Sequence, residues 1–154
     1  ALMEVLYCTA ARVSEIVSLN RSDVDFSGRA VVIYSHKNKK ERIGYLTEAA
    51  SYHLRQYLAG RTDENPALFV SHRAPYRRLG KSGIEAMLRE VGQRTGIHAY
   101  PHRYRGSFIT DACVRGWGLD EVQDYVGHAD PKTTNIYRNK KELSIRAKFD
   151  RLIA

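Results

Sequence analysis

Apolar residues recur at helical spacing through most of this chain, and only three short stretches have the pattern of strands. The segment 13–17 illustrates the first pattern, because residues three and four positions apart share one face of a helix. The segment AVVIYS (30–35) is predicted to pair antiparallel with RIGYL (42–46), and ALFVS (67–71) to form a third strand. The sequence therefore predicts a mainly α-helical fold with a small antiparallel β-sheet, an α+β class.

Capping residues mark where several helices begin and end. Thr47 is predicted to cap one helix, and Ser82 with Glu85 to form the capping box of another, which Gly96 closes. The helices expected from these signals and from apolar spacing cover residues 48–59, 83–95, 102–115 and 120–126, with one more beginning at Asp130–Pro131.

The composition is that of one globular domain. The chain has 154 residues, of which 43% are hydrophobic and 27% charged, enough for a substantial core. No apolar run approaches the ~20 residues of a membrane helix. Cys8 and Cys113 are isolated in apolar surroundings, which predicts buried, reduced thiols rather than a disulfide. We therefore expect residues 1–154 to form a single domain without a membrane partner.

Basic residues outnumber acidic ones by 25 to 17, a net charge of +8. Such a surplus favours a polyanionic partner, most often nucleic acid. A basic enzyme with another substrate can have the same composition, so charge alone leaves the partner open. The basic residues expected to contact DNA are Lys39, Lys40, Arg42, Arg77, Arg78 and Lys81.

Six polar residues occupy positions that neither helix caps nor a core require: Arg12, Lys37, His102, Arg105, His128 and Tyr137. Together they suit the attack of a phenolic oxygen on a phosphodiester. Two guanidiniums can clamp the extra negative charge of a pentacoordinate phosphorane. Imidazoles can donate hydrogen bonds or move a proton near neutral pH. A lysine can protonate the departing 5′ oxygen, and a tyrosine, whose free pKa is about 10, must lose its proton.

At these residues the sequence resembles the tyrosine recombinases, the phage integrase family of site-specific recombinases. The catalytic domain of that family carries a T-G-x-R-x-x-E segment, a hairpin lysine, an H-x-x-R segment and a G-H pair followed by a tyrosine. The matching residues are Arg12 and Glu15 in TAARVSE, Lys37 in HKNKKER, His102 and Arg105 in PHRYR, and Gly127, His128 and Tyr137 in VGHADPKTTNIY. Each motif alone is weak, whereas six roles filled in the correct order are specific.

The resemblance implies the fold of DNA breaking–rejoining enzymes and recombination by transesterification, without a metal or other cofactor. Tyr137 is the implied nucleophile, which forms a 3′-phosphotyrosyl link. The groups implied to hold the phosphate are Arg12, Arg105, His102 and His128. Lys37 is the implied general acid, with Lys39 and Lys40 of the same hairpin as alternatives, and Glu15 is a structural partner of the site.

Two positions depart from the family pattern. Ala10 stands where the family usually has glycine, so the turn before Arg12 is expected to pack differently. Gly106 follows Arg105, where a second histidine or another larger residue is common; a glycine inside a helix costs up to ~1 kcal/mol relative to alanine.

Other interpretations remain open. The chemistry is also similar to that of type IB topoisomerases, and a catalytically silent, DNA-binding integrase remnant would retain much of the same pattern. His98 and His102 have a metal-ligand spacing of four residues. However, Pro101 between them breaks the helix and no third ligand stands nearby in sequence, which argues against zinc.

The segment after Tyr137 is amphipathic, with Leu143 and Leu152 among charged residues. Its mixture of acidic and basic residues favours packing on protein over binding to a membrane surface. The resemblance implies that it docks on a neighbouring protomer and joins recombinases into a tetramer on double-stranded DNA. It also implies a separate N-terminal DNA-clamping domain, which we expect this chain to lack, and a cytoplasmic, nucleoid-associated protein of bacterial, phage or mobile-element origin.

Overall fold

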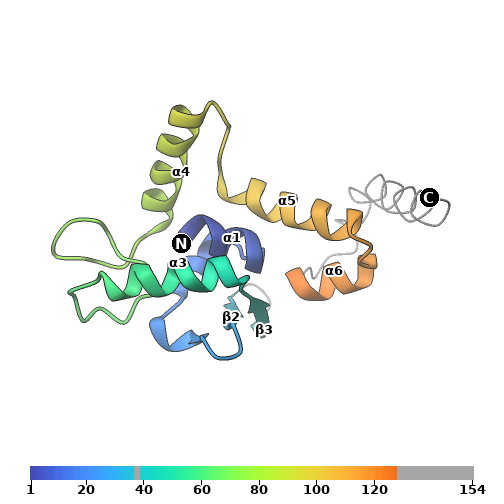
Figure 1. Cartoon of the computed structure of the whole chain (residues 1–154), viewed down its shortest axis with the longest axis horizontal. Coiled ribbons are helices and arrows are strands. Elements are labelled where there is room, and N and C mark those ends of the chain that lie inside the picture. Colours follow the sequence, from blue (N-terminus) through green and yellow to red (C-terminus); the bar gives the residue numbers. More distant parts are fainter. Residues whose placement is uncertain (37–38, 128–154) are drawn as a thin grey trace.

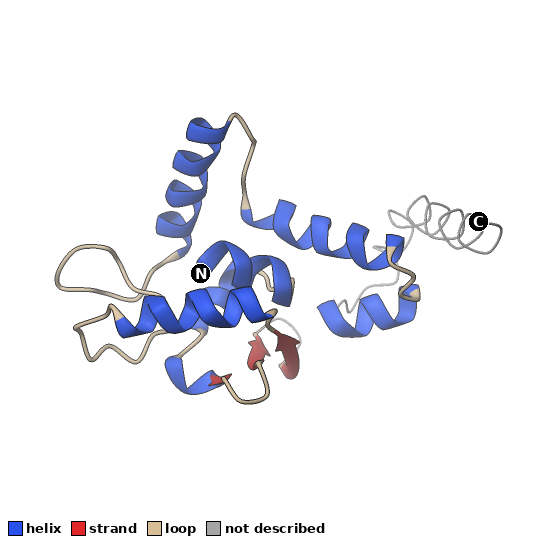
Figure 2. Ribbon diagram, viewed as in Figure 1, coloured by secondary structure: helices blue, strands red, loops and turns tan. Residues whose placement is uncertain are grey.

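The computed structural model describes residues 1–36 and 39–127, which are mostly helical with one three-stranded antiparallel sheet (Figures 1 and 2). In chain order the elements are α1 (Leu2–Thr9), α2 (Val13–Ser18), the 3-10 turn η1 (Arg21–Asp23), β1 (Val24–Asp25), β2 (Ala30–Ser35), β3 (Lys40–Tyr45), α3 (Glu48–Ala59), α4 (Lys81–Thr95), α5 (Pro101–Val114) and α6 (Leu119–Val126). The predicted α+β class is confirmed.

The sheet is built around β2, which pairs with β1 on one side and with β3 on the other. Val31 and Ile33 of β2 are fully buried, whereas Val32 and Tyr34 are exposed. This alternation is that of a strand with one face on the core. The predicted antiparallel pairing of β2 with β3 is confirmed, and its register sets Ile33 opposite Arg42.

Residues 67–71 do not form the predicted third strand; β1 takes that place beside β2. Within this segment Ala67 and Val70 form isolated bridges instead. The guanidinium of Arg61 binds the carbonyl oxygens of Ala67 at 2.6 Å and Leu68 at 3.0 Å. These carbonyls are therefore held by a side chain instead of by a neighbouring strand.

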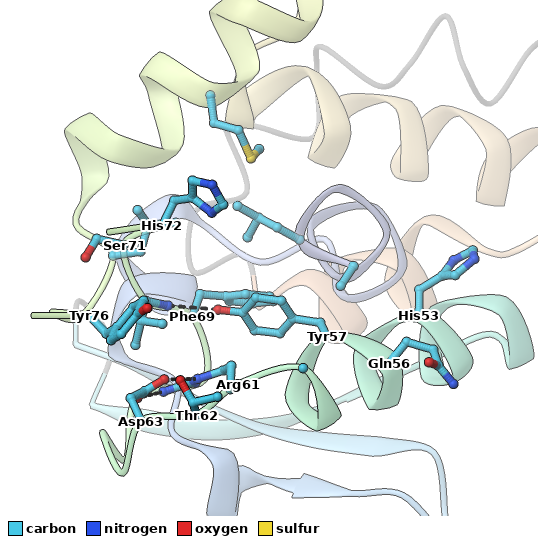
Figure 3. Close-up of a pocket in the computed structure, with 16 residues that line it drawn as sticks. His53, Gln56, Tyr57, Arg61, Thr62, Asp63, Phe69, Ser71, His72 and Tyr76 are labelled. Atoms are coloured by element: carbon cyan, nitrogen blue, oxygen red, sulfur yellow. Dashed lines mark hydrogen bonds and ion pairs between the residues drawn. The ribbon is translucent and has the colours of Figure 1, made fainter. Parts of the chain in front are cut away.

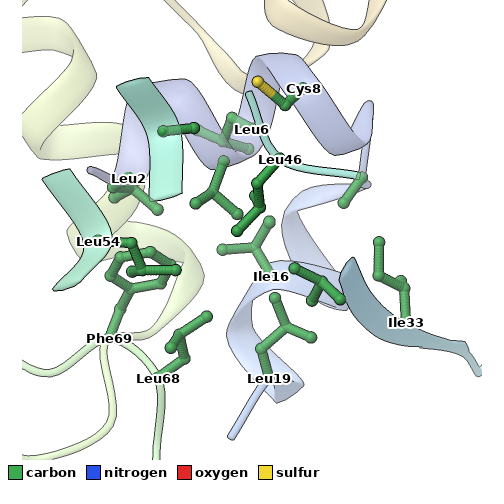
Figure 4. Close-up of a cluster of buried hydrophobic side chains, with 14 of the residues drawn as sticks. Leu2, Leu6, Cys8, Ile16, Leu19, Ile33, Leu46, Leu54, Leu68 and Phe69 are labelled. Atoms are coloured by element: carbon green, nitrogen blue, oxygen red, sulfur yellow. The ribbon is translucent and has the colours of Figure 1, made fainter. Parts of the chain in front are cut away.

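The main hydrophobic core lies among α1, α2, α3 and the buried face of the sheet (Figure 4). Ile84 and Leu88 of α4 also belong to it. Leu6, Ile16 and Leu54 come from three different helices, and each is less than 2% exposed. Burying a side chain of this size stabilises the fold by roughly 1.5–3 kcal/mol. The core thereby fixes α2, which follows Arg12, against the sheet.

A second cluster of buried apolar side chains joins α5 to α6 and contacts the chain just after α1. Its buried members are Ala10, Ile109, Ala112, Cys113, Val122 and Val126. Gly127 ends α6 with a φ of 66°, the left-handed conformation typical of a helix C-terminus. The cluster therefore holds the C-terminal end of α6 close to the end of α1.

Most helix ends agree with the sequence prediction. The side chain of Thr47 accepts a backbone hydrogen bond in the first turn of α3, and Gly96 ends α4 with a φ of 72°. The predicted capping box of Ser82 and Glu85 is wrong, because α4 begins before Ser82 and this residue lies inside the first turn. From the end of α4 an extended segment leads the chain back to the start of α5 (Figure 1).

Cys8 and Cys113 are free and buried, as the sequence predicts. They belong to different clusters, Cys8 to the main core and Cys113 to the cluster between α5 and α6. Among the described helices, none combines the length and the apolar character that crossing a membrane requires.

Candidate active site

Arg12 is held at the start of α2 by Glu15, one turn further along the helix. The Glu15 carboxylate accepts hydrogen bonds at 2.9 Å from both the backbone N and Nη1 of Arg12. Nη2 of Arg12 donates to the carbonyl oxygen of Gly127 at 3.3 Å. The Arg12 side chain is 24% exposed, so its guanidinium is both fixed and accessible from solvent.

Arg105 lies in α5, with only 4% of its surface exposed. Its Nη2 donates to the carbonyl oxygen of Val126 at 2.7 Å, and its Nη1 donates to the carbonyl oxygen of Ala10. A buried charge is costly unless hydrogen bonds compensate for its lost hydration. Here the compensation comes from main-chain oxygens, including one at the negative end of the α6 dipole.

Arg42 of β3 is a third arginine at the same place. Its Nη1 donates to the carbonyl oxygens of Thr9 and Tyr125, both at 3.0 Å, and its Nη2 to Glu15 at 3.2 Å. Arg42 is one of the predicted DNA contacts, and that contact remains a prediction. In the structure Arg42 lies opposite the buried Ile33, and its side chain is only 10% exposed.

Three consecutive carbonyl oxygens at the end of α6 are thus bound by three different arginines. The oxygens belong to Tyr125, Val126 and Gly127. The last carbonyls of a helix have no partner within the helix and carry partial negative charge. We call these three carbonyls with Arg12, Arg42 and Arg105 the arginine clamp. It unites segments that are far apart in the sequence.

Glu15 lies beside two arginines of the arginine clamp, Arg12 and Arg42, and its side chain is 2% exposed. Burial alone would raise the pKa of Glu15, but the hydrogen bonds from Arg12 and the charge of Arg42 outweigh it, so this pKa lies below its usual value. Burial lowers the pKa of Arg42, which the charge of Glu15 opposes. At neutral pH one carboxylate therefore faces two guanidiniums, which leaves a positive surplus suited to an anion.

His102 precedes Arg105 by one helical turn in α5, and its side chain is exposed. It lines a cavity of about 480 Å³ between α4 and the start of α5. The other lining residues include the basic Lys81 and Arg89, the acidic Glu85 and apolar side chains, among them Val13 at the start of α2.

Lys37, His128 and Tyr137 lie outside the described residues, and their roles remain predictions. In the chain His128 directly follows Gly127, whose carbonyl oxygen is bound by Arg12. The described residues therefore bring together Arg12, Glu15 and Arg105 of the predicted site, and they place His102 on the same helix as Arg105.

The remaining predicted DNA contacts are all exposed, and their binding to DNA remains a prediction: Lys39, Lys40, Arg77, Arg78 and Lys81. Arg78 also makes contacts within the protein, because its Nη1 donates to the carbonyl oxygens of Val17 at 2.8 Å and Leu19 at 2.9 Å, and its Nη2 to the side chain of Asn20. These hydrogen bonds fix the chain after α2.

A wider cavity of about 690 Å³ lies beside α3, away from the arginine clamp (Figure 3). Its lining is mostly apolar, and several of the polar groups on it are bound within the protein. The hydroxyl of Tyr57 accepts from the backbone N of Val70 at 3.0 Å, and Arg61 is paired with Asp63. None of the predicted site residues within the described part of the chain lines it.

In residues 1–36 and 39–127 the side chains of histidine, cysteine, aspartate and glutamate form no group of three that could hold a metal ion. His98 and His102 thus have no third ligand within this part of the chain. Independence from metals remains a prediction about the chemistry.

The sequence prediction missed Arg42 as a member of the site, although β3 contains a signal for it. Side chains alternate across a strand. Gly44 and Leu46 are buried, while Ile43 and Tyr45 are exposed. Arg42 shares the face of Gly44 and Leu46, so strand alternation predicts an arginine that points inward.

The sequence was compared with known protein families and with solved structures. The profile of the phage integrase family matches residues 1–143, a span that includes every predicted site residue. The chain belongs to the phage integrase family.

Relatives in this family carry recombinase names. The chain is 38% identical over 144 residues to the tyrosine recombinase XerC of Herpetosiphon aurantiacus, covering 89% of this chain and 46% of the relative. It is 34% identical over 134 residues to the tyrosine recombinase XerA of Pyrococcus furiosus, covering 86% of this chain and 47% of the relative. This family member thus spans about half the length of the curated relatives it matches.

Solved structures show the same fold for this member of the phage integrase family. A crystal structure of XerA recombinase matches with a TM-score of 0.81 and 32% identity, over 96% of this chain and 55% of that one. The Tn1549 transposon integrase in complex with a circular intermediate DNA matches with a TM-score of 0.78 and 18% identity, over 97% of this chain and 57% of that one. The predicted fold family is confirmed.

Proposed function

We propose that this chain is the catalytic domain of a tyrosine-type site-specific recombinase, which cleaves and rejoins DNA strands. The observation that carries the proposal is the arginine clamp. Arg12 and Arg105, which come from two separate motifs, bind adjacent carbonyls at the end of α6, and the next residue in the chain is His128. The recombinase names of the relatives and the DNA complex of a structural neighbour support it.

The proposed reaction is a transesterification. The phenolic oxygen of Tyr137 attacks the scissile phosphorus as its proton passes to an imidazole of the site or to water, and a P–O bond to tyrosine forms while the bond to the 5′ oxygen breaks. Lys37 gives a proton to the 5′ oxygen, which departs as a hydroxyl. The 3′-phosphotyrosyl link retains the bond energy, so a 5′-hydroxyl of another strand reverses the step without ATP.

The side chains of the site stabilise the negative charge that develops on the phosphate. Arg12 is partly exposed and its guanidinium has a fixed orientation, and preorganised donors of this kind are worth more than mobile ones. Arg105 adds a second positive charge from α5, and His102 and His128 donate hydrogen bonds. Glu15 fixes Arg12 without contacting the phosphate.

The proposed partners are double-stranded DNA and further copies of the protein. The net charge of +8 suits a polyanion, and the exposed lysines beside the predicted site, Lys39, Lys40 and Lys81, are the proposed phosphate contacts outside it. Recombination between two sites requires four cleaved strands, so we propose a tetramer on DNA, joined by the segment after Tyr137.

A nicked suicide DNA substrate tests the proposal, because the cleaved strand diffuses away and traps the covalent adduct. The unchanged protein is expected to form a denaturation-resistant adduct, and Tyr137→Phe to bind DNA without forming it. Tyr52→Phe is the matched control, since Tyr52 is an exposed tyrosine on α3. DNA binding without any adduct would favour a silent DNA-binding module, and relaxation of supercoiled DNA without site preference would favour a topoisomerase.

Chelator and salt provide a second test. Adduct formation is expected to continue in excess EDTA, because side chains and not a metal neutralise the phosphate. DNA binding is expected to weaken steeply with salt as counterions compete for the phosphates. Loss of cleavage in EDTA with recovery on adding magnesium or zinc would refute the proposed site.

A further inference from the structure

We propose that Arg42 is a positioning residue, which holds the end of α6 against Arg12 and Arg105, the two arginines of the phosphate site. This inference rests on the proposed function. It assigns to Arg42 a role that the sequence motifs of the site do not include.

Arg42 connects every part of the site that the structure describes, except α5. From β3 it binds the end of α1 through Thr9, the start of α2 through Glu15, and the end of α6 through Tyr125. It also lies against Gly127, where a Cβ would be 3.2 Å from Cδ of Arg42. The Gly-His pair therefore needs its glycine for two reasons, the left-handed φ of 66° and the close approach of Arg42.

The burial of Arg42 distinguishes positioning from catalysis. Its side chain is 10% exposed, less than half the value of Arg12, and its Nη atoms are taken up by protein acceptors. Its Nε is buried and finds no acceptor in the described part of the chain. An unused buried donor is costly. An apolar residue at this position would avoid that cost, but it would leave Glu15 and the carbonyl oxygens of Thr9 and Tyr125 without the donors of Arg42. The role of the arginine therefore lies in the contacts that it makes among these elements.

The planar fork of a guanidinium explains why the residue is arginine. Nη1 and Nη2 bind acceptors from three different elements at the same time. A lysine presents one compact ammonium on a flexible stem, so it can keep the charge beside Glu15 but cannot hold the three elements in one geometry. A change of this kind is expected to affect the position of α6 more than the stability of the fold.

The test compares Arg42→Met and Arg42→Lys with Arg61→Met. Arg61 is a fair control, because its side chain is 4% exposed and binds the main-chain oxygens of Asn65, Ala67 and Leu68 far from the site. Urea unfolding measures the folded fraction of each variant. The single-turnover rate of adduct formation on the nicked substrate, at saturating DNA, is then expressed per folded protein, and DNA affinity is measured separately.

Both Arg42 variants are expected to form the adduct about 10²-fold more slowly, the usual effect of misplacing a site by ~1 Å. Their DNA affinity is expected to stay near that of the unchanged protein, and Arg61→Met to lose stability but not rate. If Arg42→Met does not fold, Arg42→Lys decides the question. An unchanged rate per folded protein in either Arg42 variant, or an equal loss in Arg61→Met, would overturn the inference.

A substrate with sulfur at the bridging 5′ position distinguishes a defect in the position of α6 from a defect in the general acid on the hairpin. Its leaving group needs little protonation, so it rescues a defect in Lys37. It is expected not to rescue Arg42→Met, and rescue would show that Arg42 acts through Lys37 instead. If the unchanged protein itself forms no adduct, the proposed function fails, whereas failure of the Arg42 variants to slow a working protein rejects only this inference.

Discussion

Replacing Glu15 by glutamine is expected to lower the free energy of unfolding by about 3 kcal/mol, the lower end of the 3–5 kcal/mol for breaking a buried ion pair. The carboxylate is 2% exposed and lies 2.9 Å from Arg12 and 3.2 Å from Arg42. Glutamine has nearly the same shape but no charge, and its NH₂ group must face one of these donors. The lower end applies because Arg12 is partly exposed and regains some hydration.

Urea unfolding followed by circular dichroism measures this loss. With a slope of about 1–3 kcal/mol per molar urea, the midpoint is expected to fall by about 1–3 M while the slope stays constant. Glu85→Gln is the matched control, because Glu85 pairs with Lys81 at 3.8 Å on an exposed face of α4. Such a pair contributes only about 0.3–0.5 kcal/mol. Equal, small shifts in both variants would refute the argument that Glu15 compensates two buried guanidiniums.

Three further predictions follow from the backbone and from the same carboxylate. Because the folded-state pKa of Glu15 is lowered, the stabilisation that its charge provides is complete above the ordinary pKa of 4.5 and is lost as the pH falls through the folded pKa. When unfolding is measured at a series of pH values, the free energy of unfolding of Glu15→Gln should therefore fall less at acid pH than that of the unchanged protein. Ala10→Gly is expected to change stability by less than about 1 kcal/mol, because relief of the left-handed φ of 48° offsets the lost methyl burial. Ala50→Gly, in a helix and equally buried, is expected to cost about 2 kcal/mol in the same unfolding assay. Gly127→Ala is expected to destabilise more than Gly96→Ala by thermal unfolding, since both have left-handed φ values but only the first adds a Cβ 3.2 Å from an arginine side chain; equal losses would contradict the close approach.

Local signals in the sequence predicted most of the fold. Thr47 and Gly96 mark helix ends through the backbone conformations and hydrogen bonds of their own neighbourhoods, so no knowledge of the tertiary structure is needed. The strand predicted over residues 67–71 is wrong because a contact from elsewhere in the chain decides the structure there. Its apolar pattern reflects real burial, but Arg61 binds its carbonyls, and a side chain that binds main-chain oxygens leaves no trace in hydrophobic periodicity.

The candidate site was predictable in its motifs but not in its arrangement. Arg12 and Arg105 stand out because they occur in recognisable segments in the expected order. The carbonyl oxygens that bind these arginines do not stand out in the sequence. Every residue has a carbonyl oxygen, and the sequence cannot indicate which ones a guanidinium binds. For the same reason the sequence predicted Arg42 only as a DNA contact, although strand alternation points its side chain toward the core.

The arginine clamp binds three carbonyls that are consecutive in the chain, so it is sensitive to the length of α6. One residue added or removed inside this helix turns every later carbonyl by about 100° and moves it by about 1.5 Å. All three oxygens would then leave their arginines together. Insertions in the surface loop before residue 67 do not have this effect. During evolution α6 is therefore expected to tolerate changes of residue type on its exposed side while keeping a constant number of residues between Gly118 and Gly127.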